Sequence, residues 1–194
     1  MSFPRRMHLP LATRNTSRRL AVLFLTIAAA LVACWYFMIR MPGVSFSGPL
    51  PELTAPQCAL AQELQRDDTV LAGDIGPRCI SHPDGLQRSV EFIERSLADL
   101  GYTVERQTFQ VDRHDCHNII AEIKGSTKPE EIVVVGALYH SCHDTPAAND
   151  NGPGVAATLA LARHFAGPQK LDRTLRFVFF VNEEPPYFKT SDMG

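Results

Sequence analysis

The chain has 194 residues, 45% of them hydrophobic and 21% charged, so it is long enough for one globular core and short for two. All 21 acidic residues follow position 40, together with only 13 of the 19 Lys and Arg. Residues 41–194 are therefore acidic and lack the basic surface typical of nucleic-acid-binding proteins, so we expect no nucleic-acid partner.

The first apolar run, residues 20–39, contains no charged side chain and has the length of a membrane-spanning helix. Residues 1–19 carry five arginines, and the positive-inside rule places this basic tail in the cytoplasm and the rest of the chain on the periplasmic or extracellular side. The run is longer than the apolar core of a cleaved signal peptide, which favours a single-pass signal anchor. A cleaved signal peptide and a lipoprotein signal ending at Cys34 are the alternatives.

Four prolines between positions 42 and 56 indicate an extended linker over residues 40–56, followed by a globular domain over residues 57–194. The five cysteines have no zinc-knuckle spacing, and four of them follow the apolar run, where an oxidising compartment would allow a disulfide. Cys116 and Cys142 flank apolar runs, which favours buried free thiols at these two positions. Apolar spacing predicts helices and strands in an order that includes a strand–helix–strand crossover, which is right-handed and parallel. The expected helices cover residues 57–71, 86–100 and 152–165, and the expected strands cover residues 103–111, 117–123, 131–137 and 174–181.

The strands at 103–111 and 117–123 are predicted to form a hairpin, because both alternate and are close in sequence. The continuous β-branched run within residues 131–137 predicts a strand buried on both faces. The fold class is therefore α/β, with an antiparallel hairpin beside parallel central strands.

Carboxylates follow two of the predicted strands, Asp150 after the strand at 131–137 and Glu183–Glu184 after the strand at 174–181. The carboxyl ends of parallel strands are where α/β proteins bind ligands. Three converging carboxylates repel one another, and a divalent metal ion relieves that repulsion. Because consecutive residues of extended chain point to opposite sides, one glutamate is placed to bind metal and the other to act as a general base.

The segments V-V-V-G-A-x-Y-x-S, P-A-A-N-D-N-G-x-G-V-A-A and R-F-V-F-F-x-x-E-E resemble the co-catalytic zinc aminopeptidases of metallopeptidase family twenty-eight. The resemblance implies a three-layer α/β sandwich around a mixed, mostly parallel sheet, and hydrolysis of N-terminal residues from peptide substrates with two zinc ions. It also implies that Asp150 bridges both metal ions, that Glu183 is the general base, and that Glu184 binds the second metal ion. It further implies a cis peptide bond between Asp150 and Asn151.

The sequence departs from the family pattern where the family has a zinc-binding histidine, twelve residues before the bridging aspartate. Leu138 stands there, and leucine has no lone pair for zinc. His140, which replaces a supporting aspartate, is the candidate substitute ligand. The chain also ends ten residues after Glu184, so we expect a truncated N-terminal half of the family's domain that is inactive as written.

Two alternatives to an altered aminopeptidase remain open. One is a non-catalytic, membrane-anchored binding or structural module with a peptidase-like fold. The other is a protein that binds a single metal ion through Asp150, Glu184 and either His140 or His143.

Overall fold

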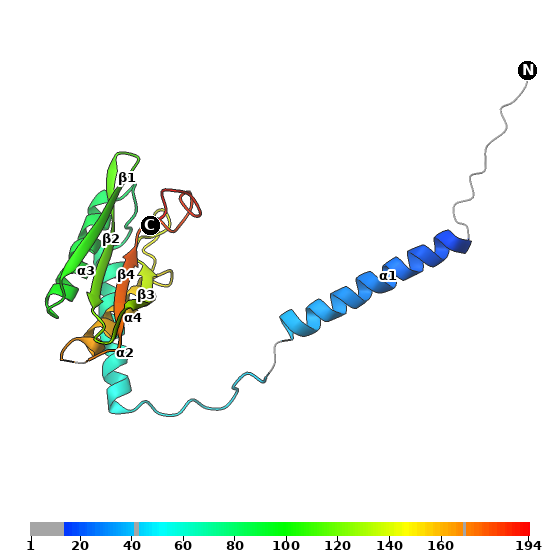
Figure 1. The fold of residues 1–194 in the computed structure, drawn as a ribbon, viewed down its shortest axis with the longest axis horizontal. Coiled ribbons are helices and arrows are strands. Elements are labelled where there is room, and N and C mark those ends of the chain that lie inside the picture. The colour runs from blue at the N-terminus through cyan, green and yellow to red at the C-terminus, as the bar shows by residue number, and fades with distance from the viewer. Residues whose placement is uncertain (1–13, 41–42, 169) are drawn as a thin grey trace, which may run out of the picture. The chain divides into compact units, whose positions relative to one another are not determined.

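A computed structural model describes residues 14–40, 43–168 and 170–194 (Figure 1). The chain divides into two units, Met1–Pro51 and Glu52–Gly194. In the first unit, helix α1 (Arg14–Cys34) continues into the π-helical segment η1 (Trp35–Ile39). The stretch Asn15–Ile39 is long and apolar enough to cross a membrane, although a signal sequence meets the same criterion. The expected apolar helix is therefore present, and its role as an anchor stays a prediction.

The second unit contains the expected helices and strands, with small shifts at their ends. Its helical segments are α2 (Ala55–Asp68), η2 (Thr69–Ile75), α3 (Pro83–Ala98) and α4 (Gly152–Phe165). Its strands are β1 (Val104–Val111), β2 (His114–Ile123), β3 (Lys128–Leu138) and β4 (Arg173–Phe180). Prolines occupy the first turns of α2, α3 and α4, where their missing N–H groups leave no helical hydrogen bond unmade.

The four strands form one mixed sheet in the order β1-β2-β4-β3. The β1–β2 hairpin is antiparallel as predicted, and β4 pairs antiparallel with β2. Strands β3 and β4 are parallel, with Leu138 opposite Phe180, so the predicted crossover through α4 is confirmed. The described residues thus form a mixed sheet with one parallel and two antiparallel pairs.

The prediction that the strand at 131–137 is buried on both faces is wrong. Strand β3 lies at the edge of the sheet, and Ile132, Val133 and Val134 are 43%, 48% and 55% exposed. A β-branched run reports a preference for strand geometry and cannot by itself tell a central strand from an edge strand.

The core lies between the sheet and helices α3 and α4, which contact both the sheet and each other (Figure 1). Helix α3 contributes an apolar stripe at helical spacing, and β4 contributes alternate aromatic side chains. Each fully buried side chain of this size stabilises the fold by about 1.5–3 kcal/mol. The residues at the centre of this core include Val90, Ile93, Leu97, Val155, Leu159, Phe177 and Phe179. This packing fixes β3 and β4 side by side, and with them the loops that follow their carboxyl ends.

Candidate active site

A buried arginine holds the loop between β3 and α4 in place. Arg78 is fully buried, and its guanidinium donates hydrogen bonds to five backbone carbonyls. The acceptors are the oxygens of Leu71, Gly76, Tyr139, Pro146 and Ala147, at 2.6–3.2 Å. Burial lowers the pKa of Arg78 to about 10, and the nearby carboxylate of Asp68 acts in the opposite direction.

The backbone of Arg78 also pairs with the residues that follow β3. The Arg78 N–H donates to Ser141 Oγ at 2.9 Å, and the Ser141 N–H donates to the Arg78 carbonyl at 3.0 Å. This role of Arg78 was not predicted from the sequence. The sequence did contain one signal of this role, a lone arginine inside the Gly- and Pro-rich segment before α3. In such a segment, the long arginine side chain has no apolar core to pack over.

The first turn of α4 positions Asp150. The Asn151 side chain caps the helix by accepting a hydrogen bond from the Gly154 N–H at 3.0 Å. The Asp150–Asn151 peptide bond is cis, as the family resemblance implied. Asp150 itself is exposed and lies just before the helix, where the helix dipole favours a negative charge.

The structure brings the three predicted carboxylates into one electrostatic environment. Glu183 and Glu184 follow β4 directly and are half-buried. Burial raises the pKa of Glu184, the carboxylates of Asp150 and Glu183 raise it further, and His143 lowers it. This convergence of carboxylates agrees with the expected meeting of two strand ends. His143 also acts on Glu184, although the sequence had not favoured His143 as a site residue.

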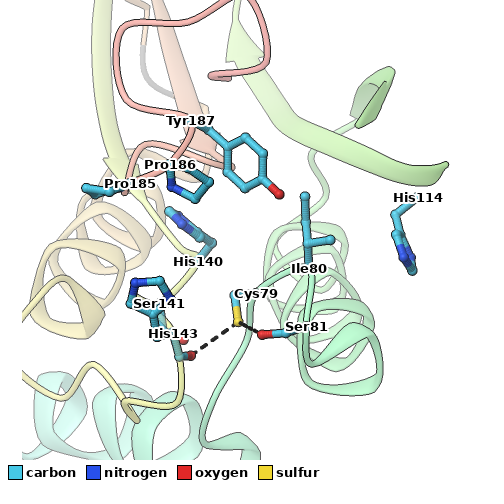
Figure 2. A pocket seen from close by; sticks show the side chains of 10 residues that line it. All are labelled: Cys79, Ile80, Ser81, His114, His140, Ser141, His143, Pro185, Pro186 and Tyr187. Carbon is cyan, nitrogen blue, oxygen red and sulfur yellow. Dashed lines mark hydrogen bonds between the residues drawn. The ribbon is translucent and has the colours of Figure 1, made fainter. Parts of the chain in front are cut away.

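His140 lies in a different environment from the carboxylates. It is only 2% exposed, and its Nδ1 atom is buried without a hydrogen-bond partner among the residues that the structure describes. Burial lowers the pKa of His140 to about 4, and the charge that acts on it is the guanidinium of Arg78. Its ring lines a cavity of about 390 Å³ together with Pro185, Pro186 and Tyr187 (Figure 2). The carboxylate at Glu184 is thus affected by His143 and not by His140.

Comparisons with known proteins find relatives that match most of this chain. The chain is 30% identical over 171 residues to the uncharacterized protein YfbL of Escherichia coli, covering 81% of this chain and 51% of the relative. It is 29% identical over 173 residues to leupeptin-inactivating enzyme 1 of Streptomyces exfoliatus, covering 88% of this chain and 39% of that enzyme. The chain therefore spans about half the length, or less, of these curated relatives.

Among solved structures, BSAP, a zinc aminopeptidase from Bacillus subtilis, matches with a TM-score of 0.59 and 15% identity. The match covers 64% of this chain and 62% of that enzyme, and it establishes the fold as that of a zinc aminopeptidase. The model of Peptidase family M28 matches residues 118–189, a range that includes Asp150, Glu183 and Glu184. The family resemblance seen in the sequence is confirmed.

The residues present do not fit the pair of zinc ions that the family resemblance implies. Leu138 ends β3 at the position where the family resemblance implies a zinc-binding histidine, and its side chain offers no donor atom. Within the described ranges, no group of three or more His, Cys, Asp and Glu side chains is close enough to hold a metal ion. Asp150 and Glu184 supply carboxylate oxygens, but His140 does not join them.

Proposed function

We propose that this domain has the architecture of an aminopeptidase acting on peptide N-termini, but that its own residues do not assemble a working two-zinc site. Leu138 is the observation that carries the proposal. A catalytic zinc ion is held by three protein ligands, and leucine removes one of them. Asp150, Glu183 and Glu184 keep the places that the family resemblance gives to the bridging carboxylate, the general base and a metal ligand.

The proposed role of Glu183 follows from its position beside Glu184. Successive residues in extended chain point to opposite sides, so one carboxylate is available to a cation and the other to a proton. The raised pKa of Glu184 supports a crowded group of negative charges, which is the environment that attracts a divalent cation. His140 is proposed as the substitute ligand only after a change of its surroundings, because it now lies against Arg78.

We also propose that residues 20–39 anchor the protein in a membrane with the N-terminus in the cytoplasm and the peptidase-like domain in the periplasm or outside the cell. The apolar stretch Asn15–Ile39 supports the span, and the arginines before it support the orientation. The substrate is then a peptide on the outer side of that membrane.

A non-catalytic binding module is the second candidate function. It is favoured by the same substitution at Leu138, which removes a ligand while leaving the strand, the loop and the carboxylates in place. The cavity lined by His140 and Tyr187 is the surface on which such a module would hold a peptide.

Metal analysis and hydrolysis of aminoacyl-anilides by the full chain in detergent test the proposal. The unaltered chain is expected to hold less than one zinc ion and to show no hydrolysis above the blank. The double variant Leu138→His, His140→Asp is expected to bind more zinc, and addition of Glu183→Gln to it should preserve zinc binding and remove any hydrolysis gained. Hydrolysis by the unaltered chain that Glu183→Gln abolishes would contradict the proposal.

A further inference from the structure

We propose that Cys79 is a nucleophilic thiol that exchanges with low-molecular-mass disulfides and holds the resulting adduct in the cavity beside His140. The geometry consists of three side chains from two loops. The Cys79 Sγ atom lies 3.4 Å from His82 Nδ1, and His82 Nε2 lies 3.5 Å from Asp144 Oδ1. A thiol, an imidazole and a carboxylate in this order form a proton relay of the kind that activates cysteine nucleophiles.

The relay is built where two loops meet. Cys79 and His82 lie between η2 and α3, and Asp144 lies in the loop that follows β3. The hydrogen bonds between Arg78 and Ser141 hold these loops together one residue before Cys79. The backbone positions of the two loops are therefore fixed relative to each other, and the exposed Asp144 side chain completes the relay from the surface.

Two groups besides His82 contact the sulfur atom. Ser81 Oγ lies 3.0 Å from Cys79 Sγ, and the His143 carbonyl oxygen lies 3.2 Å from it (Figure 2). The carbonyl accepts the proton of the neutral thiol. When His82 takes that proton, the Ser81 hydroxyl and the His82 Nδ1–H group become two donors to the thiolate, which stabilises the charged form.

The sulfur atom has a space to react into. Cys79 is only 8% exposed, but it lines the cavity of about 390 Å³ that His140, Pro185 and Tyr187 also line (Figure 2). A cavity of this volume lies within the range that accommodates small organic ligands. The Nδ1 atom of His140, buried and without a partner, offers this cavity one unused polar contact for a bound molecule.

The reaction balances without a metal ion or a further oxidant. Cys79 transfers its proton to His82, and its sulfur attacks one sulfur of a disulfide R–S–S–R. The bond between Cys79 Sγ and that sulfur forms as the S–S bond of the reagent breaks, and the second half leaves as a thiolate. The proton on His82 returns to this thiolate, giving R–SH, while Asp144 stabilises the charged imidazole in between. The adduct then fills the cavity.

The other cysteines provide internal standards. Cys58 is exposed, and its Sγ atom contacts only a carbonyl, that of Leu53 at 3.9 Å, among the hydrogen bonds that the structure gives it. Cys116 is 1% exposed in the core. If exposure alone controlled the rate, Cys58 would react first and Cys79 would behave like Cys116. The proposed relay reverses the order of Cys58 and Cys79.

Glutathione disulfide is the probe for the test. The full chain in detergent is incubated with it at neutral pH, quenched by alkylation and digested, and the adduct at each cysteine is followed by mass spectrometry over time. Cys79 is expected to react roughly ten times faster than Cys58, because His82 Nδ1 lies 3.4 Å from the sulfur atom and can accept its proton as the sulfur attacks. Cys116 is expected to stay unmodified, which reports that the domain is folded.

Two variants separate the relay from simple access. His82→Gln should slow the reaction of Cys79 roughly tenfold, and Asp144→Asn should slow it by a smaller factor, with the Cys58 rate unchanged in both. Asp144 has a side chain that is 87% exposed, so Asp144→Asn leaves the fold intact even if His82→Gln does not. A Cys79 rate at or below that of Cys58, or one that Asp144→Asn and a folded His82→Gln leave unchanged, would overturn the proposal. Neither outcome depends on zinc binding or peptide hydrolysis.

Discussion

Replacing Arg78 by leucine should cost far more stability than a change of similar size elsewhere. The guanidinium donates to five carbonyls that are otherwise shielded by the fold. Hydrogen bonds to a charged group contribute roughly 1.5 kcal/mol each, or about 7 kcal/mol for the set. Burial of the cation offsets part of this, because lowering its pKa to about 10 corresponds to about 3 kcal/mol. The expected net loss for Arg78→Leu is therefore about 4 kcal/mol.

Urea unfolding followed by far-ultraviolet circular dichroism measures this loss. Arg176→Leu is the matched control, because the partner of Arg176 among the described residues is the exposed Glu122, and its removal should change the free energy of unfolding by less than about 1 kcal/mol. Arg78→Lys should lie between the two, since a lysine keeps the charge but has only three donors at one point. If the free energies of unfolding of Arg78→Leu and Arg176→Leu differ by less than about 1 kcal/mol, the five carbonyls do not depend on the guanidinium for their stability.

The remaining predictions concern a titration, a hydrogen bond and a close contact. Burial lowers the pKa of His140 in the folded protein to about 4, from the ordinary 6.5. As the pH falls, the unfolded chain therefore takes up this proton before the folded protein does, and about 3 kcal/mol of the free energy of unfolding should be lost between pH 6.5 and pH 4. His140→Gln should flatten that pH profile, and an equally steep profile in the variant would assign the effect to other groups. Tyr139→Phe removes the hydrogen bond to the His117 carbonyl at 2.9 Å and should lower the free energy of unfolding by about 1–2 kcal/mol; an unchanged urea midpoint would argue against it. Gly85→Ala places a Cβ atom 2.0 Å from the Pro77 carbonyl oxygen and should lower the melting temperature through a loss of about 2 kcal/mol, whereas normal melting would show that this segment can shift.

Regular secondary structure could be predicted closely from the sequence because local pattern determines it. The helix predicted at 152–165 has these bounds in the structure, with Asn151 as its cap, since a capping residue and a first-turn proline mark its start. The burial of β3 could not be predicted, because burial depends on which strands pair with it. Which strands pair is determined by tertiary contacts, and it cannot be predicted from the residues of β3 alone.

The site was predictable in part for the same reason. Asp150, Glu183 and Glu184 follow from the rule that ligands gather at the carboxyl ends of parallel strands. The surroundings of His140 could not be predicted in this way, because the charge that acts on it belongs to Arg78, which lies 62 residues earlier in the sequence. The contact between His82 and Asp144 likewise joins two loops that are distant in sequence, and no local spacing predicts it.

The strand order also constrains when the site can form. Strand β4 lies between β2 and β3 although it follows both in the chain, so β3 has no neighbour in the sheet until residues 173–180 have been made. During synthesis the β1–β2 hairpin can form early, because its contacts are local. Asp150 and Glu184 can meet only when β4 enters the gap and closes a long loop. The carboxylate cluster is therefore among the last features of this domain to appear during folding, and a partly folded chain would carry the hairpin without the site.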